Sequence, residues 1–285
     1  MRILILSVVS ILFILTGSSC KKEQNDTQEE FISDSMRIVS LTPSITKQLY
    51  LLGVEDLVVG HTSYCPSEGL KNSELVASAM EVNVEKIATL HPDIVLVTTL
   101  VKSKIVDKLK MLGINVQYLP SPKSFNEICN QFIELGAAVE RKSKAISIVK
   151  AQEEKLDSLQ NTIPPGKKLK YFIEIGAKPL YAATPESFMH DYIRYANGIN
   201  IAEGLKSGTM SRESVIVKNP DVIVIVTMGI VGKEEKEIWQ DYPNLNASKN
   251  GRIFVIDSDL ASSPTPITFT NVVGKIINKV YNQNN

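Results

Sequence analysis

One uninterrupted helical stretch, Glu140–Thr162, most constrains the fold of this 285-residue chain. It contains no Gly or Pro, and Pro164-Pro165-Gly166 ends it. A helix of about 20 residues is about 30 Å long, roughly the width of a small domain. The stretch therefore fits either one packing helix among several or a strut that joins two halves of the chain. Its apolar side chains recur at helical spacing, at Ala145, Ile148, Val149, Leu156 and Leu159.

Composition excludes some classes of function. The formal net charge at neutral pH is zero, and Lys and Arg are spread along the chain. This pattern predicts neither a nucleic-acid-binding stripe nor a binding field of a single sign. A chain of this length has room for one large domain or for two smaller ones.

The N-terminal residues predict a secretion signal over 1–20. Arg2 precedes an apolar run over 3–15, and small residues lead into Cys20. The run is too short for a membrane span, which needs about 20 residues. The small residues before a Cys resemble a bacterial lipoprotein signal, so Cys20 is the expected lipidation site, and secretion without a lipid is the alternative. Residues 21–36 are mostly polar and predict a flexible tether.

Strand and helix patterns alternate on both sides of the long helix. Before it, strands are expected over 37–41, 57–60, 94–97 and 114–119, and helices over 45–52, 85–90 and 106–112. After it, strands are expected over 169–175, 221–226 and 252–256, and helices over 187–196 and 267–281. This alternation predicts the α/β fold class, with mainly parallel sheets covered by helices.

The second half of the chain repeats a pattern of the first. NVEKIATLHPDIVLVTT (83–99) aligns with SRESVIVKNPDVIVIVT (211–227), which places Pro92-Asp93 on Pro220-Asp221. A repeat on each side of the long helix predicts two lobes of similar build, and it favours the strut over a simple packing helix. The predicted parts are a signal peptide (1–20), a tether (21–36), an N-terminal lobe (37–137), a connecting helix (138–162) and a C-terminal lobe (163–285).

The sequence carries no motif of a serine hydrolase, a zinc protease, a phosphate loop or a dinucleotide-binding domain. His61, His91 and His190 are far apart, so each is expected to have a structural or surface role and not to bind a metal. Cys129 lies on the apolar face of FNEICNQFIEL and is expected to be a buried apolar residue. A disulfide between Cys129 and Cys65 is the alternative.

Polar side chains recur directly after the expected strands. Ligands of open α/β sheets bind outside the carboxyl ends of the strands, and two lobes with such ends facing one another form a cleft. The polar positions are Thr42, Ser44, Thr62–Tyr64, Thr98-Thr99, Lys178, Thr227-Met228 and Asp257–Ser263.

Several segments resemble the substrate-binding proteins of ABC importers for cobalamin, haem and ferric siderophores. They are RIVSLTPSIT, VGHTSYC, EKIATLHPDIVLV, SFMHDYIRYANGINIAE, SRESVIVKNPDVIVI and NASKNGRIFVID, and the resemblance extends from Arg37 to the C-terminus. It implies two Rossmann-like lobes joined by one rigid backbone helix, with a metal chelate held between them. It also implies a monomeric receptor without a cofactor, located in the cell envelope, whose partner is an ABC permease dimer in the inner membrane.

The resemblance implies that Tyr64 lines the ligand pocket. Tryptophans that cover the macrocycle in cobalamin-binding members are absent, and Ala79, Thr98 and Ser207 stand at the aligned positions. Trp239 is instead expected to pack inside the C-terminal lobe. The complete set of expected ligand contacts is Tyr64, Met80, Thr98, Lys178, Tyr181, Ser207, Met210, Met228 and Ser263.

Glu85 and Glu213 each lie in the first turn of an expected helix, where the helix dipole favours a carboxylate. The resemblance implies a second role, in which each glutamate docks into an arginine pocket of one permease subunit. The expected function is thus capture of a corrinoid, haem or ferric siderophore, without catalysis. A receptor for free Zn²⁺ or Mn²⁺ and a tethered hydrolase are the alternatives.

Overall fold

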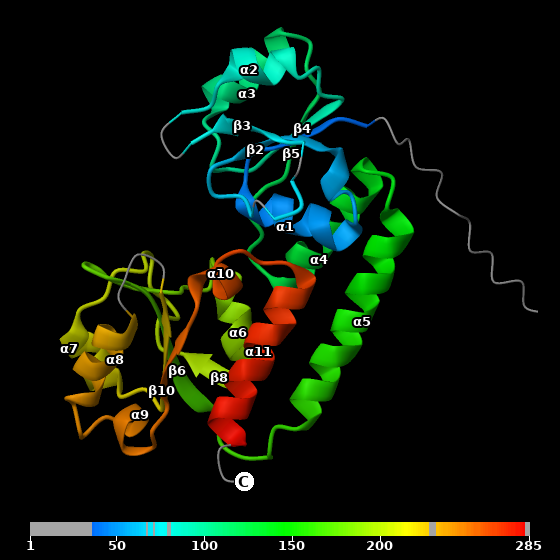
Figure 1. The fold of residues 1–285 in the computed structure, drawn as a ribbon. Helices are drawn as coiled ribbons and strands as arrows, with labels where there is room; N and C mark the ends of the chain where they lie inside the picture. Colours follow the sequence, from blue (N-terminus) through cyan, green and yellow to red (C-terminus); the bar gives the residue numbers. More distant parts are fainter. Residues whose placement is uncertain (1–35, 67, 71, 79–80, 228–231, 283–285) are drawn as a thin grey trace, which may run out of the picture. The chain divides into compact units, whose positions relative to one another are not determined.

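The computed structural model describes residues 36–66, 68–70, 72–78, 81–227 and 232–282 (Figure 1). The predicted signal peptide with Cys20 and the tether up to residue 35 lie outside the described residues, as do Ala79, Met80 and Met228. Among the residues that are described, no helix is both long enough and apolar enough to cross a membrane.

The first sheet is parallel throughout, with the strand order β3-β2-β1-β4-β5. Its strands are β1 (Ile38–Ser40), β2 (Val58–Thr62), β3 (Glu74–Ala77), β4 (Ile94–Val97) and β5 (Val116–Tyr118). The chain places later strands on opposite sides of β1, so the order reverses between β1 and β4. Such a switch point leaves a crevice at the carboxyl ends of the two strands, where ligands of this fold class bind.

Helices cover both faces of the first sheet. Alternate residues of each strand point to opposite faces, so both faces carry apolar side chains that pack against helices. Ile94 and Leu96 of β4 pack into one apolar cluster with α1 and α4, whereas Val95 and Val97 pack into another with α2 and α3. The elements around this sheet are α1 (Pro43–Leu52), a 3₁₀ turn (Glu55–Leu57), α2 (Val84–Thr89), α3 (Ser103–Met111) and α4 (Phe125–Ala138).

The second sheet has the order β10-β9-β6-β7, and β8 pairs with β6 as well. All its pairings are parallel except that of β6 with β7. Its strands are β6 (Leu169–Ala177), β7 (Leu180–Ala182), β8 (Gly198–Asn200), β9 (Val222–Val226) and β10 (Ile253–Ile256). Its helices are α6 (Met189–Tyr195), α7 (Arg212–Lys218), α8 (Gly232–Gln240), α9 (Asn246–Lys249), α10 (Ser258–Ala261) and α11 (Pro266–Tyr281). The predicted α/β class with two mainly parallel sheets is therefore confirmed.

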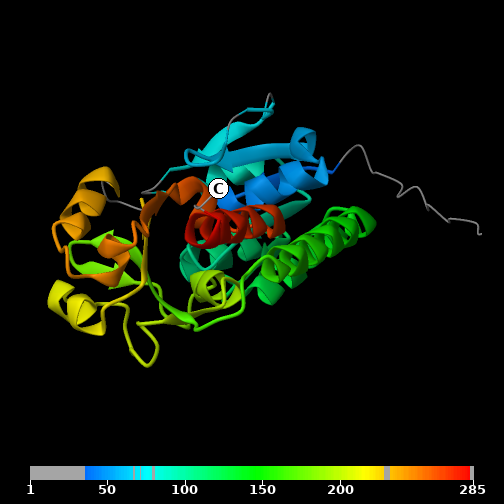
Figure 2. The same cartoon turned by 90° about the horizontal axis from the view of Figure 1, so that it is seen from below.

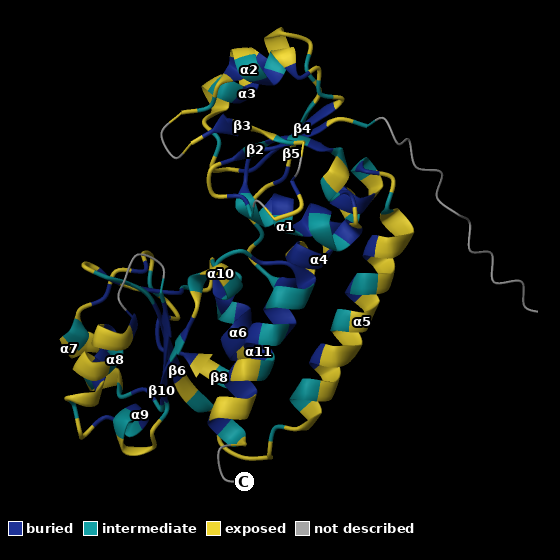
Figure 3. Ribbon diagram, viewed as in Figure 1, coloured by how far each residue is buried: buried dark blue, intermediate teal, exposed yellow. Residues whose placement is uncertain are grey.

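The predicted long helix is α5 (Lys142–Asn161), which lies between the two sheets in the sequence. It packs against α4 and α11, and α11 lies beside it in two views (Figures 1 and 2). Ala145, Val149 and Leu156 are buried, and exposed residues alternate with them along the helix (Figure 3). The apolar stripe expected from the sequence is thus the face that α5 buries.

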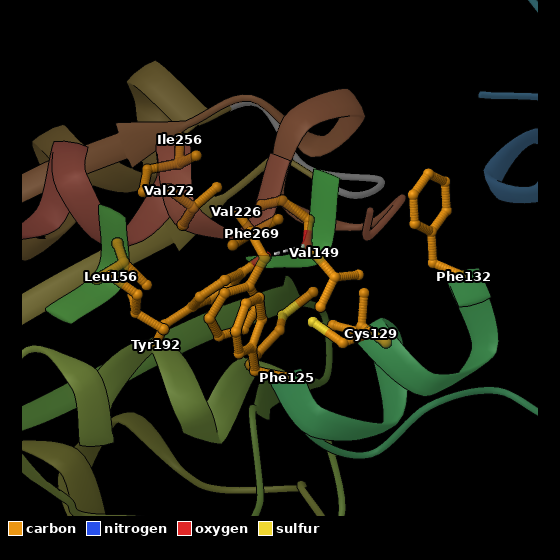
Figure 4. Packing of buried hydrophobic residues seen from close by; sticks show 14 of the residues in the cluster. Phe125, Cys129, Phe132, Val149, Leu156, Tyr192, Val226, Ile256, Phe269 and Val272 are labelled. Atoms are coloured by element: carbon orange, nitrogen blue, oxygen red, sulfur yellow. Dashed lines mark hydrogen bonds between the residues drawn. The ribbon is translucent and has the colours of Figure 1, made fainter. Parts of the chain in front are cut away.

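Side chains from both halves of the chain form one apolar cluster around these helices (Figure 4). Phe125 of α4 stacks on Phe269 of α11 with 4.6 Å between the ring centroids. Phe269 also contacts Tyr192 of α6 at a centroid distance of 4.8 Å. Offset aromatic pairs at this separation add stability beyond the area they bury.

The sequence repeat is also a structural repeat. In the first sheet the Arg37 amide donates to Asp93 Oδ2 (2.7 Å), and the Asp93 amide donates to the Arg37 carbonyl (2.9 Å). In the second sheet the Lys170 amide donates to Asp221 Oδ2 (2.8 Å), and the Asp221 amide donates to the Lys170 carbonyl (2.8 Å). Each Pro-Asp thus ties the start of one strand to its neighbour in the same way. The limits predicted for the two lobes stay a prediction.

Candidate functional site

A cavity of about 690 Å³ lies at the carboxyl ends of the first sheet's strands. Its volume is within the range of small-molecule pockets. Residues that follow β1 and β4 line it together, which places it at the switch point of the strand order. Its lining comprises Leu41–Pro43, Thr62, Tyr64, Ala77, Ser78, Glu81, Val82, Val84, Glu85, Leu100–Lys102, Lys104, Ile105 and Lys108.

Tyr64 projects from an ordered turn that follows β2. The Tyr64 amide donates to Thr62 Oγ1 (3.3 Å), and the Cys65 amide donates to the Thr62 carbonyl (3.0 Å). Cys65 is buried, where its Sγ accepts from Thr46 Oγ1 (3.0 Å), whereas the Tyr64 side chain is 65% exposed and lines the cavity. The Thr62 and Cys65 side chains of this turn are therefore buried, and the Tyr64 ring lies at the cavity.

Three predicted contacts of the second half lie on neighbouring segments around β7. Tyr181 pairs with Thr209 through an isolated bridge, and the Met210 amide donates to the Leu180 carbonyl (3.0 Å). Tyr181 is exposed and so is Ser207, but Met210 is only 8% exposed and packs in a core cluster with Trp239. The fold thus brings Tyr181 and Ser207 to one surface, while the Met210 side chain points into the lobe.

The remaining described candidates differ in exposure. Lys178 is exposed in the turn between β6 and β7, and Ser263 is half-buried after α10. Thr98 is buried, and its Oγ1 accepts from the Leu100 amide (3.4 Å). Tyr64 is therefore the one described member of the predicted set that lines the cavity. The sequence prediction did not include Lys102, Lys104 and Lys108, which line it from α3 and its N-terminal cap.

The histidines and cysteines make local contacts. His61 Nδ1 lies 2.8 Å from Ser73 Oγ, and burial, with a smaller effect of Lys86, lowers the pKa of His61. No group of three or more His, Cys, Asp or Glu side chains in the described ranges is placed to hold a metal ion. Cys65 and Cys129 are both free, so the alternative of a disulfide is wrong. Cys129 is buried in the shared core as predicted, and burial raises its pKa to about 12.

Trp239 packs inside the second half, as predicted, and belongs to a buried polar network. It is fully buried, and its Nε1 donates to Glu174 Oε2 (2.6 Å). The guanidinium of Arg212 lies 4.3 Å from the Trp239 ring centroid and pairs with Glu235. The network joins β6, α7 and α8 through side chains that are far apart in the sequence.

Burial raises the pKa of Glu174 from its ordinary value of 4.5 to about 8. The neighbouring Glu235 carboxylate adds to this rise, while the hydrogen bond from Trp239 and the charge of Arg212 oppose it. Burial and the neighbouring carboxylate thus favour the protonated form of Glu174 in the folded protein, which lowers the repulsion between two buried carboxyl groups.

Glu85 and Glu213 are exposed in the first turns of α2 and α7, as predicted. Both helices begin in the same way: the Asn83 side chain accepts from the Lys86 amide (2.8 Å), and the Ser211 side chain accepts from the Ser214 amide (3.2 Å). Hydrogen bonds from its own amide and from Ser211 lower the pKa of Glu213. Glu85 also lines the cavity.

Residues 38–260 match the family described as periplasmic binding protein. The chain belongs to this family. It is 34% identical over 242 residues to the uncharacterized ABC transporter substrate-binding lipoprotein YvrC of Bacillus subtilis, covering 81% of this chain and 75% of that protein. It is 26% identical over 241 residues to the vitamin B12-binding protein of Vibrio cholerae, covering 83% of this chain and 86% of that protein.

A solved structure shows the same fold. The possible iron-binding (periplasmic solute-binding) protein of Staphylococcus epidermidis superposes with a TM-score of 0.75 at 28% identity, covering 86% of this chain and 98% of that chain. The fold and family expected from the sequence are therefore confirmed. The relatives are solute-binding proteins and not enzymes.

The buried Glu174 generates a prediction about pH. Because its folded pKa lies above its unfolded value, its proton stabilises the folded state below about pH 4.5, and this contribution is lost as the pH rises to about 8. Wild-type stability is thus expected to fall over this window, and Glu174→Gln is expected to flatten the fall. Thermal unfolding between pH 5 and 8.5 measures it, with Glu234→Gln, an exposed change on α8, as the control. Equal slopes for Glu174→Gln and wild type would contradict the assignment.

Proposed function

We propose that this protein is the substrate-binding lipoprotein of an ABC importer, which captures a metal chelate and delivers it to a membrane permease. The family match over residues 38–260 carries this proposal. Support comes from the Bacillus subtilis relative, whose name describes an ABC transporter substrate-binding lipoprotein, and from the vitamin B12-binding relative of Vibrio cholerae. The site is the cavity at the carboxyl ends of the first sheet, with Tyr64 as its aromatic contact.

The proposed ligand class is a corrinoid, haem or ferric siderophore. A cavity of about 690 Å³ with mixed apolar and polar walls suits part of a large chelate better than a bare ion. A bare transition-metal ion needs several imidazole, thiolate or carboxylate ligands at one point, and the described residues offer no such group. We place the second half of the chain on the other side of the ligand, with contacts from Lys178, Tyr181, Ser207 and Ser263.

Ligand binding tests the proposal directly. Calorimetric titration of the protein with cyanocobalamin, haem and a ferric tricatecholate is expected to show saturable binding of at least one of the three. Tyr64→Ala is expected to weaken that binding by about 1–3 kcal/mol, the scale of a lost buried aromatic contact. Tyr118→Ala is the control, because Tyr118 is an exposed tyrosine on β5 outside the cavity lining.

The titrations of wild type and of Tyr64→Ala test the receptor function and the role of Tyr64 separately. If none of the three chelates binds, the importer-receptor function is wrong. If a chelate binds and Tyr64→Ala leaves its affinity unchanged with the fold intact, Tyr64 lies outside the binding site.

Glu85 and Glu213 supply the proposed docking contacts with the permease. Glu–Arg pairs are charge-assisted and orient a transient complex, so reversing both charges removes attraction and adds repulsion. The double variant Glu85→Arg and Glu213→Arg is expected to lower uptake by roughly tenfold or more, and each single change is expected to have a smaller effect. Chelate uptake by cells that carry each variant measures this.

Affinity for the chelate must be measured beside uptake, because Glu85 also lines the cavity. Docking predicts that the double variant keeps near-wild-type affinity in solution. Glu154→Arg reverses an exposed charge on α5 and serves as the control. Normal uptake by the double variant, or loss of chelate binding in solution, would reject the docking role.

The lipid anchor at Cys20 is part of the proposal, and the lipoprotein name of the Bacillus subtilis relative supports it. A lipid on Cys20 and a tether over 21–36 hold the receptor in the cell envelope, in the periplasm or at the membrane surface. Cys20→Ser is expected to move the protein from the detergent phase to the aqueous phase in phase partitioning, since acyl chains provide the membrane affinity. A wild-type protein already in the aqueous phase would show that Cys20 carries no lipid.

A further inference from the structure

Three lysines give the cavity a cationic wall. Lys102, Lys104 and Lys108 line it, and all three are exposed. None of their ammonium groups has a hydrogen-bond or ion-pair partner within the described part of the chain. Elsewhere, Lys86 pairs with Glu74 (3.0 Å between Nζ and Oε2). The ammonium groups on the cavity wall thus form no ion pair with the described residues.

The arrangement of these lysines costs stability. Lys104 and Lys108 stand four residues apart on α3 and share one face of the helix, where like charges repel. Lys102 and Lys104 lie at the N-terminus of α3, the positive end of the helix dipole, which disfavours further positive charge. An incoming anion relieves both penalties at once.

Two helix N-termini add to the positive potential. The caps of α3 and α1, Lys102 and Thr42, both line the cavity. Neither cap makes a side-chain hydrogen bond to its helix, and neither helix has an acidic residue in its first turn. Thr42 is 2% exposed and its Oγ1 has no hydrogen-bond partner in the described structure. The first-turn amides of both helices are therefore free of the side-chain acceptors that cap α2 and α7.

Glu81 and Glu85 oppose this potential, because they line the same cavity. The three lysines exceed the two glutamates by one charge, and the two helix dipoles add to the excess. Glu85 lies at the start of α2, where it offsets that helix's own dipole. The positive groups gather on α3 and its cap, and the negative groups lie at the start of α2 and just before it, so the cavity has a cationic side.

We propose that this cavity selects chelates with anionic oxygen groups on their periphery, carboxylates or deprotonated catecholates, which Lys102, Lys104 and Lys108 contact. This inference rests on the proposed receptor function and narrows its ligand class. Haem, with two carboxylates, and a ferric tricatecholate carry two or more such charges, whereas cyanocobalamin carries one phosphodiester anion and has no net charge. The lysines then act as contact residues that set specificity, beside the aromatic contact of Tyr64.

The test compares three chelates on the full-length mature protein. Wild type is expected to bind haem or the ferric tricatecholate more tightly than cyanocobalamin, and the affinity for the anionic chelate is expected to fall as salt rises. The double variant Lys102→Glu and Lys104→Glu is expected to lose at least about tenfold in affinity for that chelate and most of the salt dependence. Glutamates at a helix N-terminus are favoured by the dipole, so α3 stays folded in this variant.

Two further variants sharpen the comparison. Lys102→Gln with Lys104→Gln removes the charges without reversing them and is expected to give an intermediate loss. Lys150→Glu is the control, because Lys150 is an exposed lysine on α5 outside the cavity lining. Its affinity is expected to equal that of wild type.

The outcomes separate this inference from the function on which it rests. Tighter binding of cyanocobalamin than of both anionic chelates overturns the inference and leaves the receptor function intact. Unchanged affinity of the double charge reversal for the preferred chelate does the same. If the protein binds none of the three chelates, the receptor function fails and the inference fails with it. Preference for haem or for the tricatecholate identifies whether the lysines contact carboxylates or catecholates.

Discussion

Both halves of the chain depend on one shared apolar core. Ile94 and Leu96 of β4 contribute to it from the first half, and Val224 of β9 contributes from the second. At α4 the Phe125 ring stacks on α11, and the Phe125 amide donates to the buried Asp191 Oδ2 (2.8 Å) on α6. Because α5 separates α4 from α6 and α11 in the sequence, neither half can complete this core alone. Both sheets therefore pack against a core that is complete only when the two halves of the chain come together.

The opposite faces of the two sheets bury smaller, separate clusters. The helices that cover these clusters carry Glu85, Glu213 and the cavity lysines Lys104 and Lys108. α7 shows what this implies, because Val215 is its one buried residue. Ile216 is partly buried against the same cluster, and Arg212 stacks on Trp239 and pairs with Glu235. A buried polar network therefore orients the helix that carries Glu213, in a place where apolar burial is small.

Local sequence patterns predicted the elements whose secondary structure is determined by their own residues. β4 and β9 follow Pro-Asp and are entirely apolar, and α5 has a continuous apolar stripe. The short strands β3, β7 and β8 were not predicted, because three or four residues carry no clear period and long-range pairing defines them. Tyr64 was predictable from its place after β2, whereas the lysines of α3 look like an ordinary solvated face until strands distant in sequence assemble the cavity.

The zero net charge of the chain and the cationic wall of the cavity are compatible, because they act over different distances. The 31 basic and 31 acidic residues give a net charge of zero, so the chain as a whole has no net charge that attracts an anionic ligand over long distances. At physiological ionic strength charges are screened beyond about 8 Å. Electrostatic selectivity between ligands then comes from unpaired charges close to the ligand. Lys102, Lys104 and Lys108 meet this condition, since the cavity keeps them together and the described fold gives them no partner of its own.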